Sequence, residues 1–229
     1  MFIVLCPEKS DRAQRWDFTK DNIVRHLGFW SDSPEVKERL SNYRFMWNIR
    51  NPQHKYAPVA CMEGHMDIWK KIVREDLKDV VVLEDDADVD WDKVNKFIEE
   101  KDKPEGLIYL GGRIRPTVHH NVKWGVNRLK EFASCVKAKD GINLVEQHFI
   151  IAGATSYYIP NKTVAEAMLK GVWGKTKYRS TLLDFAMAKI PAKLVKQYFW
   201  FPAIVLLDKN CLTLIPPHKP VENNNNYYY

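Results

Sequence analysis

The 229-residue sequence has few cysteines, no long apolar run and no signal-like segment at its beginning. The cysteines, Cys6, Cys61, Cys135 and Cys211, are scattered without a CxxC pair, which argues against a zinc site or a disulfide framework and fits reduced, mostly core thiols. The longest apolar run, 199–207, is too short to span a bilayer. We therefore expect a soluble, cytoplasmic protein with no membrane span.

The excess of basic residues is mild, with a net charge of +6 and a pI near 9.0. Such a charge permits binding to nucleic acid, to an anionic membrane or to phosphorylated small molecules. The basic residues are spread through 123–139 and 170–196 without an arginine-rich block, so we expect no nucleic-acid partner. We expect one domain over 1–221, and a low-complexity tail or linker start over 222–229, so that the chain could belong to a longer one.

Short apolar segments alternate with amphipathic ones along the chain. Strands are expected at 2–6, 80–83, 107–110, 149–159 and 203–207. Helices are expected at about 10–27, 59–74, 91–100, 163–171 and 180–189, with irregular segments at 30–57 and 113–146. This alternation predicts a mostly parallel sheet sandwiched by helices in a single α/β domain.

The segment VVVLEDDADVDWD, residues 80–92, combines a buried-type strand with a group of carboxylates. Ligands bind at the carboxyl ends of strands in open α/β sheets, so chemistry is expected there. Asp86 and Asp88 repel each other unless a cation lies between them, and Mg²⁺ or Mn²⁺ takes carboxylate oxygens while keeping positions open for a diphosphate. The alternative is a solvated acidic turn that caps the helix beginning near Trp91.

Four segments together resemble glycosyltransferase family 25, which contains lipooligosaccharide and collagen galactosyltransferases on the GT-A nucleotide-diphospho-sugar fold. They are VLCPEKSDRAQRW with its Asp-Arg pair, ACMEGHMDIWKKI with Cys61 and His65, VVVLEDDAD, and GATSYYIPNKTVAEAML followed by Leu183-Asp184. The second segment has Ala60 and Gly64 where the family has Gly and Ser, and the proline of the family's Pro-x-Asp segment is absent. Compact transferases of giant and chlorella viruses are similar, which would imply the host cytoplasm.

The resemblance implies a metal-dependent glycosyltransferase that moves a sugar from a nucleotide-diphosphate donor, expected to be a UDP-sugar, to a hydroxyl of a glycan or glycoprotein. It implies that Asp86 and Asp88 hold Mn²⁺ or Mg²⁺, with His218 as a candidate third ligand. Asp184 is then the expected general base on the acceptor hydroxyl. The family favours inversion at the anomeric carbon, although similar folds also catalyse retention.

The resemblance to GT-A proteins implies that the nucleotide lies at the end of the first strand. Two glycines, Gly111 and Gly112, follow another expected strand, and their missing side chains let the backbone approach a ligand or turn sharply. The expected donor-binding residues are Leu5, Pro7, Arg12, Arg15, Asp86, Gly111 and Gly112.

Several of these candidate residues also have a purely structural interpretation. Arg12 and Arg15 could be solvated helix residues, and Asp184 could merely complement a helix dipole. His65 shares a helical face with Cys61, and we expect a hydrogen-bonded core histidine there rather than a ligand. Alternative functions are a nucleotidyltransferase or phosphohydrolase that uses the same carboxylates, and a non-catalytic nucleotide-sugar-binding module.

Overall fold

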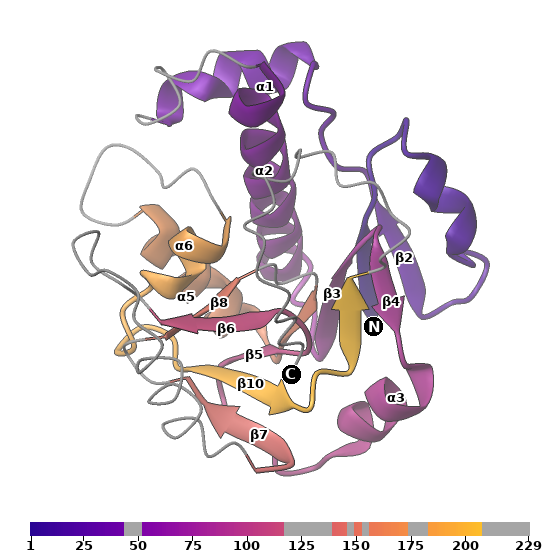
Figure 1. Cartoon of the computed structure of the whole chain (residues 1–229), viewed down its shortest axis with the longest axis vertical. Coiled ribbons are helices and arrows are strands. Elements are labelled where there is room, and N and C mark those ends of the chain that lie inside the picture. Colours follow the sequence, from indigo (N-terminus) through magenta and orange to yellow (C-terminus); the bar gives the residue numbers. More distant parts are fainter. Residues whose placement is uncertain (44–51, 117–138, 146–148, 153–155, 174–182, 208–229) are drawn as a thin grey trace, which may run out of the picture.

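The computed structural model describes residues 1–43, 52–116, 139–145, 149–152, 156–173 and 183–207. Within these residues a seven-stranded sheet has the order β2-β1-β3-β9-β5-β10-β7 (Figure 1). Its strands are β1 (Phe2–Leu5), β2 (Ile23–His26), β3 (Val80–Glu84), β5 (Leu107–Tyr109), β7 (Gly141–Leu144), β9 (Ser156–Ile159) and β10 (Gln197–Phe201). Strands β9 and β7 run antiparallel to their neighbours, and the others share one direction. The mostly parallel α/β sheet of a single-domain, GT-A-like fold is therefore confirmed.

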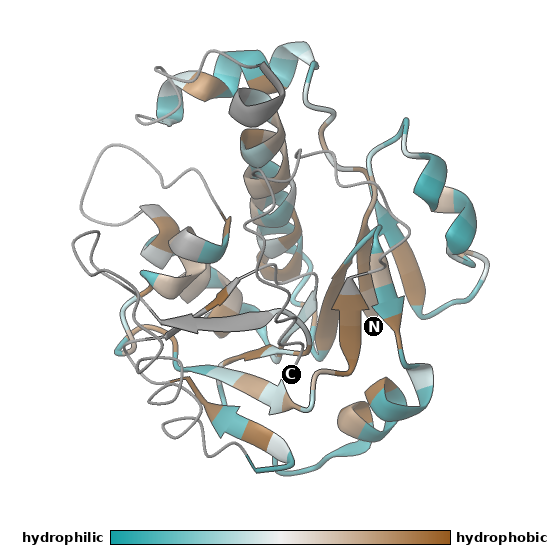
Figure 2. Cartoon of the chain, in the orientation of Figure 1, coloured by the Kyte–Doolittle hydropathy of each residue, from teal (hydrophilic) through white to brown (hydrophobic). Residues whose placement is uncertain are grey.

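Helices cover both faces of this sheet. Buried residues of α1 (Pro34–Arg39), α2 (Pro52–Arg74), α5 (Lys162–Trp173) and α6 (Leu183–Ala188) join one core, and those of α3 (Trp91–Glu99) join the other. Strands β1 and β3 lie between the two cores and are hydrophobic except for Glu84 at the end of β3 (Figure 2). Successive side chains of a strand point to opposite faces, so Val80 and Val82 meet the α2 side while Val81 and Leu83 meet the α3 side.

Two short antiparallel pairs lie outside the main sheet. Strand β4 (Ala87–Val89) pairs with β11 (Val205–Leu207), and β6 (Arg113–Pro116) pairs with β8 (Phe149–Ala152). The acidic segment after β3 is therefore not only a loop, because its second half forms β4. The single strand expected over 149–159 is also corrected, since β8 and β9 belong to different sheets.

The helix expected over residues 10–27 is wrong. A 3-10 helix, η1 (Asp11–Arg15), begins after Ser10, whose side chain accepts a hydrogen bond from the Arg12 amide. It ends at once, because Asp17 accepts hydrogen bonds from both the amide and the hydroxyl of Thr19 and so favours a turn. Strand β2 then pairs in parallel with β1. The local sequence pattern of residues 10–27 does not indicate this pairing.

The segment 30–57, expected to be irregular, contains α1 and the first turns of α2. Ser33 accepts a hydrogen bond from the Val36 amide, and Pro34 occupies the first turn, which together start α1. A second 3-10 helix, η2 (Leu40–Asn42), follows α1. The expected helix at 91–100 is confirmed as α3, and the tail at 222–229 lies outside the described residues.

None of the described helices is long and apolar enough to cross a bilayer.

Candidate functional site

The carboxyl end of β3 places three acidic residues in two directions. Glu84 continues the series Val80 and Val82, so its side chain lies on the α2 side of the sheet. The chain leaves the strand after Glu84, and Asp85 and Asp86 contact residues in and around η1. One strand end therefore supplies carboxylates to two neighbouring environments.

On the η1 side, Arg12 is the cationic partner of two carboxylates. Its Nη1 atom lies 3.3 Å from Asp85 Oδ1 and 3.4 Å from Asp86 Oδ2. The Ser10 hydroxyl donates a hydrogen bond to the Asp85 carboxylate, and Trp16 Nε1 donates one to the Asp85 carbonyl oxygen at 3.1 Å. The first and third family-like segments are thus joined by side-chain contacts.

On the α2 side, Glu84 is held by a chain of neutral hydrogen bonds. Trp69 Nε1 donates to the Tyr157 hydroxyl at 2.8 Å, and this hydroxyl lies 2.6 Å from His65 Nδ1. The indole N–H can only donate, so the hydroxyl hydrogen is available for Nδ1, and Nε2–H then donates to Glu84 Oε1 at 3.0 Å. Cys61 Sγ lies 3.9 Å from the same carboxylate oxygen.

The electrostatics of the site favour neutral side chains. Burial, with the charge of Asp184 next in importance, raises the pKa of Glu84 to about 8. Burial, followed by the charge of Glu84, raises the pKa of Asp86 to about 7. Burial lowers the pKa of His65 to about 4, so this imidazole is neutral at pH 7. The cluster is therefore rich in potential negative charge and would be stabilised by a cation.

One carboxylate oxygen is left without a partner. Asp86 Oδ2 faces Arg12, but Asp86 Oδ1 is buried and forms no hydrogen bond within the described residues. An unsatisfied buried acceptor costs free energy, and a bound cation would remove that cost. Carboxylate oxygens such as Asp86 Oδ1 are the ligands that a hard divalent ion such as Mg²⁺ or Mn²⁺ prefers.

Asp184, the expected general base, lies in the first turn of α6 and reaches the same site electrostatically. Its charge acts on Cys61, His65 and Glu84. Helix α6 is tied to the sheet by Gln197, whose side chain donates a hydrogen bond of 2.7 Å to the Met187 carbonyl oxygen. The fourth family-like segment is thus brought to the acidic segment.

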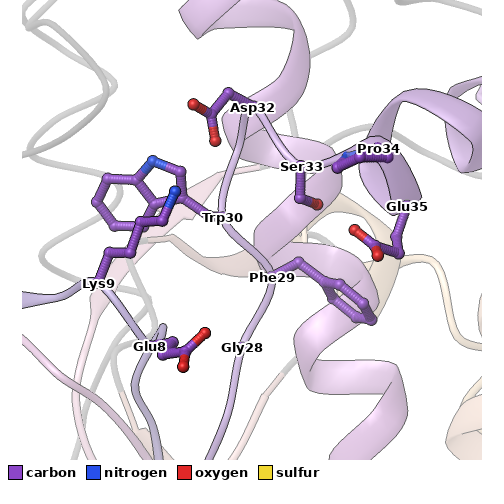
Figure 3. A pocket seen from close by; sticks show the side chains of 9 residues that line it. All are labelled: Glu8, Lys9, Gly28, Phe29, Trp30, Asp32, Ser33, Pro34 and Glu35. Carbon is purple, nitrogen blue, oxygen red and sulfur yellow. The ribbon is translucent and has the colours of Figure 1, made fainter.

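A pocket of about 350 Å³ lies beyond the carboxyl ends of β1 and β2 (Figure 3). Lys9, Trp30 and Asp32 are among the residues that line it. The residue after Lys9 is Ser10, whose hydroxyl contacts Asp85, so the pocket and the acidic cluster share one loop. The pocket offers an aromatic ring, Trp30, and a cation, Lys9, on the loop that leads to the acidic cluster.

The other residues expected around the first strand have structural roles in the described chain. Leu5 is buried at the end of β1, where a Cβ atom on Gly28 or Gly64 would approach its Cδ1 to 2.9 Å. The Pro7 carbonyl oxygen accepts a hydrogen bond of 2.9 Å from Arg25 Nη2. Arg15 ends η1 and is exposed.

The remaining residues that the sequence predicted for the site are Asp88, Gly111, Gly112 and His218. Asp88 is exposed on β4, where it pairs with Leu206 of β11. A Cβ atom on Gly111 would lie 2.2 Å from the Val205 carbonyl oxygen, so the missing side chain makes room for protein backbone. Gly112 has a φ of +108°, which corresponds to the sharp-turn alternative. His218 lies outside the described residues.

Sequence reasoning missed the partners of the acidic segment. It did not link Glu84 to His65 or Asp85 to Ser10, and it did not identify Trp30 as a pocket residue. One signal was available for Glu84: it follows Val82 by two residues in β3, which places it on the same face as Val80 and Val82. The other contacts depend on how distant segments pack.

The fold and the site define an α/β protein of GT-A-like architecture with an acidic cluster at the carboxyl edge of its sheet. The family model Glycosyltransferase family 25 (LPS biosynthesis protein) matches residues 15–180. The chain belongs to glycosyltransferase family 25. The match includes α2, β3 and Tyr157, whereas Arg12 and Asp184 lie just outside its two ends. A search of curated proteins found no match.

Proposed function

We propose that the protein is a metal-dependent glycosyltransferase that moves a sugar from a UDP-linked donor to a hydroxyl of a glycan or glycoprotein. The observation that carries this proposal is the cluster of buried carboxylates at the end of β3, with the unpartnered Asp86 Oδ1 at its centre. A hydrogen-bonded acidic turn would satisfy this oxygen, whereas a cation-binding site needs it free. Family membership supports glycosyl transfer as the reaction class.

The pocket beside η1 is the proposed binding site for the nucleotide of the donor. Trp30 offers a ring on which a base can stack, and Lys9 offers positive charge for a phosphate beside the lining carboxylates of Glu8, Asp32 and Glu35. The Phe29 ring beside Trp30 lies 4.5 Å beneath the Arg39 guanidinium, and Arg39 pairs with Glu63 of α2 at 2.9 Å. This wall of the pocket is therefore anchored to α2 before a ligand arrives.

Asp86 and Asp88 are the proposed metal ligands, with His218 as the proposed third. When bound, Mn²⁺ or Mg²⁺ neutralises the charge that develops on the leaving diphosphate. Arg12 keeps the Asp85 and Asp86 carboxylates oriented toward η1, and through them orders the loop that carries Lys9.

Asp184 is the proposed general base. As the acceptor oxygen forms its bond to the anomeric carbon, Asp184 takes the hydroxyl proton and the sugar–phosphate bond breaks, which releases UDP and inverts the anomeric carbon. The charge of Asp184 acts on Glu84 from the first turn of α6, which supports a role for Asp184 beside the acidic cluster.

Calorimetry with UDP, with and without Mn²⁺, tests the metal–donor site. Wild-type protein should bind UDP more tightly with Mn²⁺, and Asp86→Ala and Asp88→Ala should each lose that dependence. If Asp88→Ala keeps it, Asp88 is not a ligand; if both variants keep it, the proposed metal site is wrong. Asp90→Ala, which changes an exposed carboxylate that caps α3, is the matched control.

The product distinguishes the proposed reaction from its alternatives. Incubation with a panel of UDP-sugars and glycan acceptors should release free UDP together with an extended glycan. Release of pyrophosphate or a nucleoside monophosphate would indicate phosphoryl chemistry. Donor binding without any turnover over the whole panel would favour a binding module.

A further inference from the structure

Three potential metal-ligand atoms of different chemistry converge beneath the acidic cluster. Within the described residues, Cys61 Sγ, His65 Nε2 and a Glu84 carboxylate oxygen lie within 4.8 Å of one another. Glu84 Oε1 is 3.0 Å from His65 Nε2 and 3.9 Å from Cys61 Sγ. With the bond lengths of zinc sites, tetrahedral geometry places a nitrogen and an oxygen ligand about 3.3 Å apart and a sulfur and an oxygen ligand about 3.5 Å apart. Both observed separations from Glu84 Oε1 lie within about 0.4 Å of these values, so small side-chain shifts would bring each pair to ligand spacing.

Secondary structure fixes the three side chains before any ion binds. Cys61 and His65 are one helical turn apart on α2 and share a face. Glu84 ends β3 on the face that packs against α2. The ligands therefore come from two rigid elements, which reduces the ordering cost of binding.

The second ring nitrogen of His65 has the support typical of a metal-binding histidine. The Tyr157 hydroxyl lies 2.6 Å from Nδ1 and also accepts a hydrogen bond from Trp69 Nε1. If Nε2 bound a cation, Nδ1 would carry the proton and donate it to this hydroxyl. Such outer contacts orient the imidazole and raise its basicity.

We propose that Cys61, His65 and Glu84 form a site for a zinc-class divalent cation, separate from the hard-metal site proposed at Asp86. Thiolate and imidazole ligands select Zn²⁺ over Mg²⁺ or Mn²⁺, which prefer oxygen. A thiolate and a carboxylate together balance the charge of the ion, and the negative charge of Asp184 acts electrostatically on all three side chains. The ion would hold α2 against the end of β3 and fix the position of Glu84.

Cobalt substitution tests this site in the full chain without an activity measurement. Wild-type protein, stripped with chelator and titrated with Co²⁺, should take up one equivalent with tetrahedral visible bands and a thiolate-to-cobalt charge-transfer band. Zn²⁺ should displace the cobalt and bleach both. If wild-type protein shows no thiolate band at saturating Co²⁺, the three side chains form only a hydrogen-bonded cluster and the proposal is overturned.

Matched variants identify the ligands. Cys61→Ser should abolish the charge-transfer band, while Cys6→Ser, which changes the other free cysteine of the described residues, should keep it. Tyr157→Phe should keep the band but weaken Co²⁺ binding by about 10–100-fold, because only an outer contact is lost. A band that persists in Cys61→Ser, or that disappears in Cys6→Ser, would overturn the assignment.

Asp86→Ala separates this site from the proposed donor site. The variant should lose Mn²⁺-dependent UDP binding and keep the cobalt spectrum. Loss of the cobalt spectrum in Asp86→Ala that remains folded by circular dichroism would show that the two sites are one, against the proposal.

Discussion

The two sides of the β3 end carry the same kind of residue but surround it differently. On the η1 side, Asp85 and Asp86 face the permanent cation Arg12. On the α2 side, Glu84 faces the neutral imidazole of His65, and its pKa is raised to about 8. Paired charge therefore organises one side, and neutral hydrogen bonds organise the other.

The proposed function assigns a different role to each side. The η1 side adjoins the pocket lined by Lys9, Trp30 and the carboxylates of Glu8, Asp32 and Glu35, where we propose that the donor binds. The charge of Asp184, the proposed general base, acts on Glu84 on the α2 side. Variants on the η1 side should change donor binding, and variants on the α6 side should change the rate of transfer.

The largest expected effect belongs to Asp184→Asn. The amide keeps the shape of the carboxylate but loses its basicity, so kcat should fall by about 10²–10⁴-fold. UDP binding with Mn²⁺ should stay unchanged, because the lost interaction belongs to the transition state. Steady-state kinetics and calorimetry on the same preparation check both parts. If the variant transfers sugar at nearly the wild-type rate, Asp184 is not the general base and only complements the dipole of α6.

Arg12→Gln should lower the free energy of unfolding. Removing the cation leaves two partly buried carboxylates facing each other, and hydrogen bonds to charged groups contribute about 1.5–3 kcal/mol each. Glu75→Gln removes two surface ion pairs, with Lys71 and Arg74, and should cost less than about 1 kcal/mol. Urea unfolding of the two variants measures the contrast, and equal losses would mean that Arg12 acts only as a surface residue.

Trp30→Ala should weaken UDP binding without changing stability much. Stacking of a base on an aromatic ring contributes about 1–3 kcal/mol. Trp91→Ala, which changes an exposed tryptophan away from the pocket, is the control. Calorimetry with UDP in the presence of Mn²⁺ gives the two affinities. Unchanged affinity in Trp30→Ala would place the base elsewhere.

The smallest effect is a pH dependence of the metal-free protein. Between pH 6.5 and 8 the folded Glu84 and Asp86, with pKa values of about 8 and 7, hold protons that the unfolded chain has already lost. Stability should therefore fall as pH rises, by less than about 1 kcal/mol per pH unit after allowance for solvent. His65, with its pKa lowered to about 4, acts only below this window and in the opposite direction.

Thermal melts in chelator across this pH range measure the slope. Glu84→Gln should flatten it, because the amide does not titrate. A slope that is the same in Glu84→Gln and in wild type would contradict the contribution assigned to this carboxyl.

Much of the fold was predictable where the local pattern was strong. Val80, Val81, Val82 and Leu83 have no exposed surface, as their uninterrupted apolar run predicted. The predicted helix at 59–74 begins earlier, at Pro52, because α2 continues through Pro58, which is normally a breaking signal. The residues of the short β2 were predicted as part of a helix, because their own sequence does not indicate that they pair with β1. The strand forms because of that pairing.

The sequence by itself determined which strand end carries the carboxylates and that Glu84 points away from Leu83, because both properties follow from the two-residue period of a strand. The tertiary structure decided their partners. Arg12 is 73 residues from Asp85, and Tyr157 is 92 residues from His65. Contacts across such separations depend on the packing of whole elements, and only that packing surrounds one side of the strand end with a cation and the other with a buried imidazole.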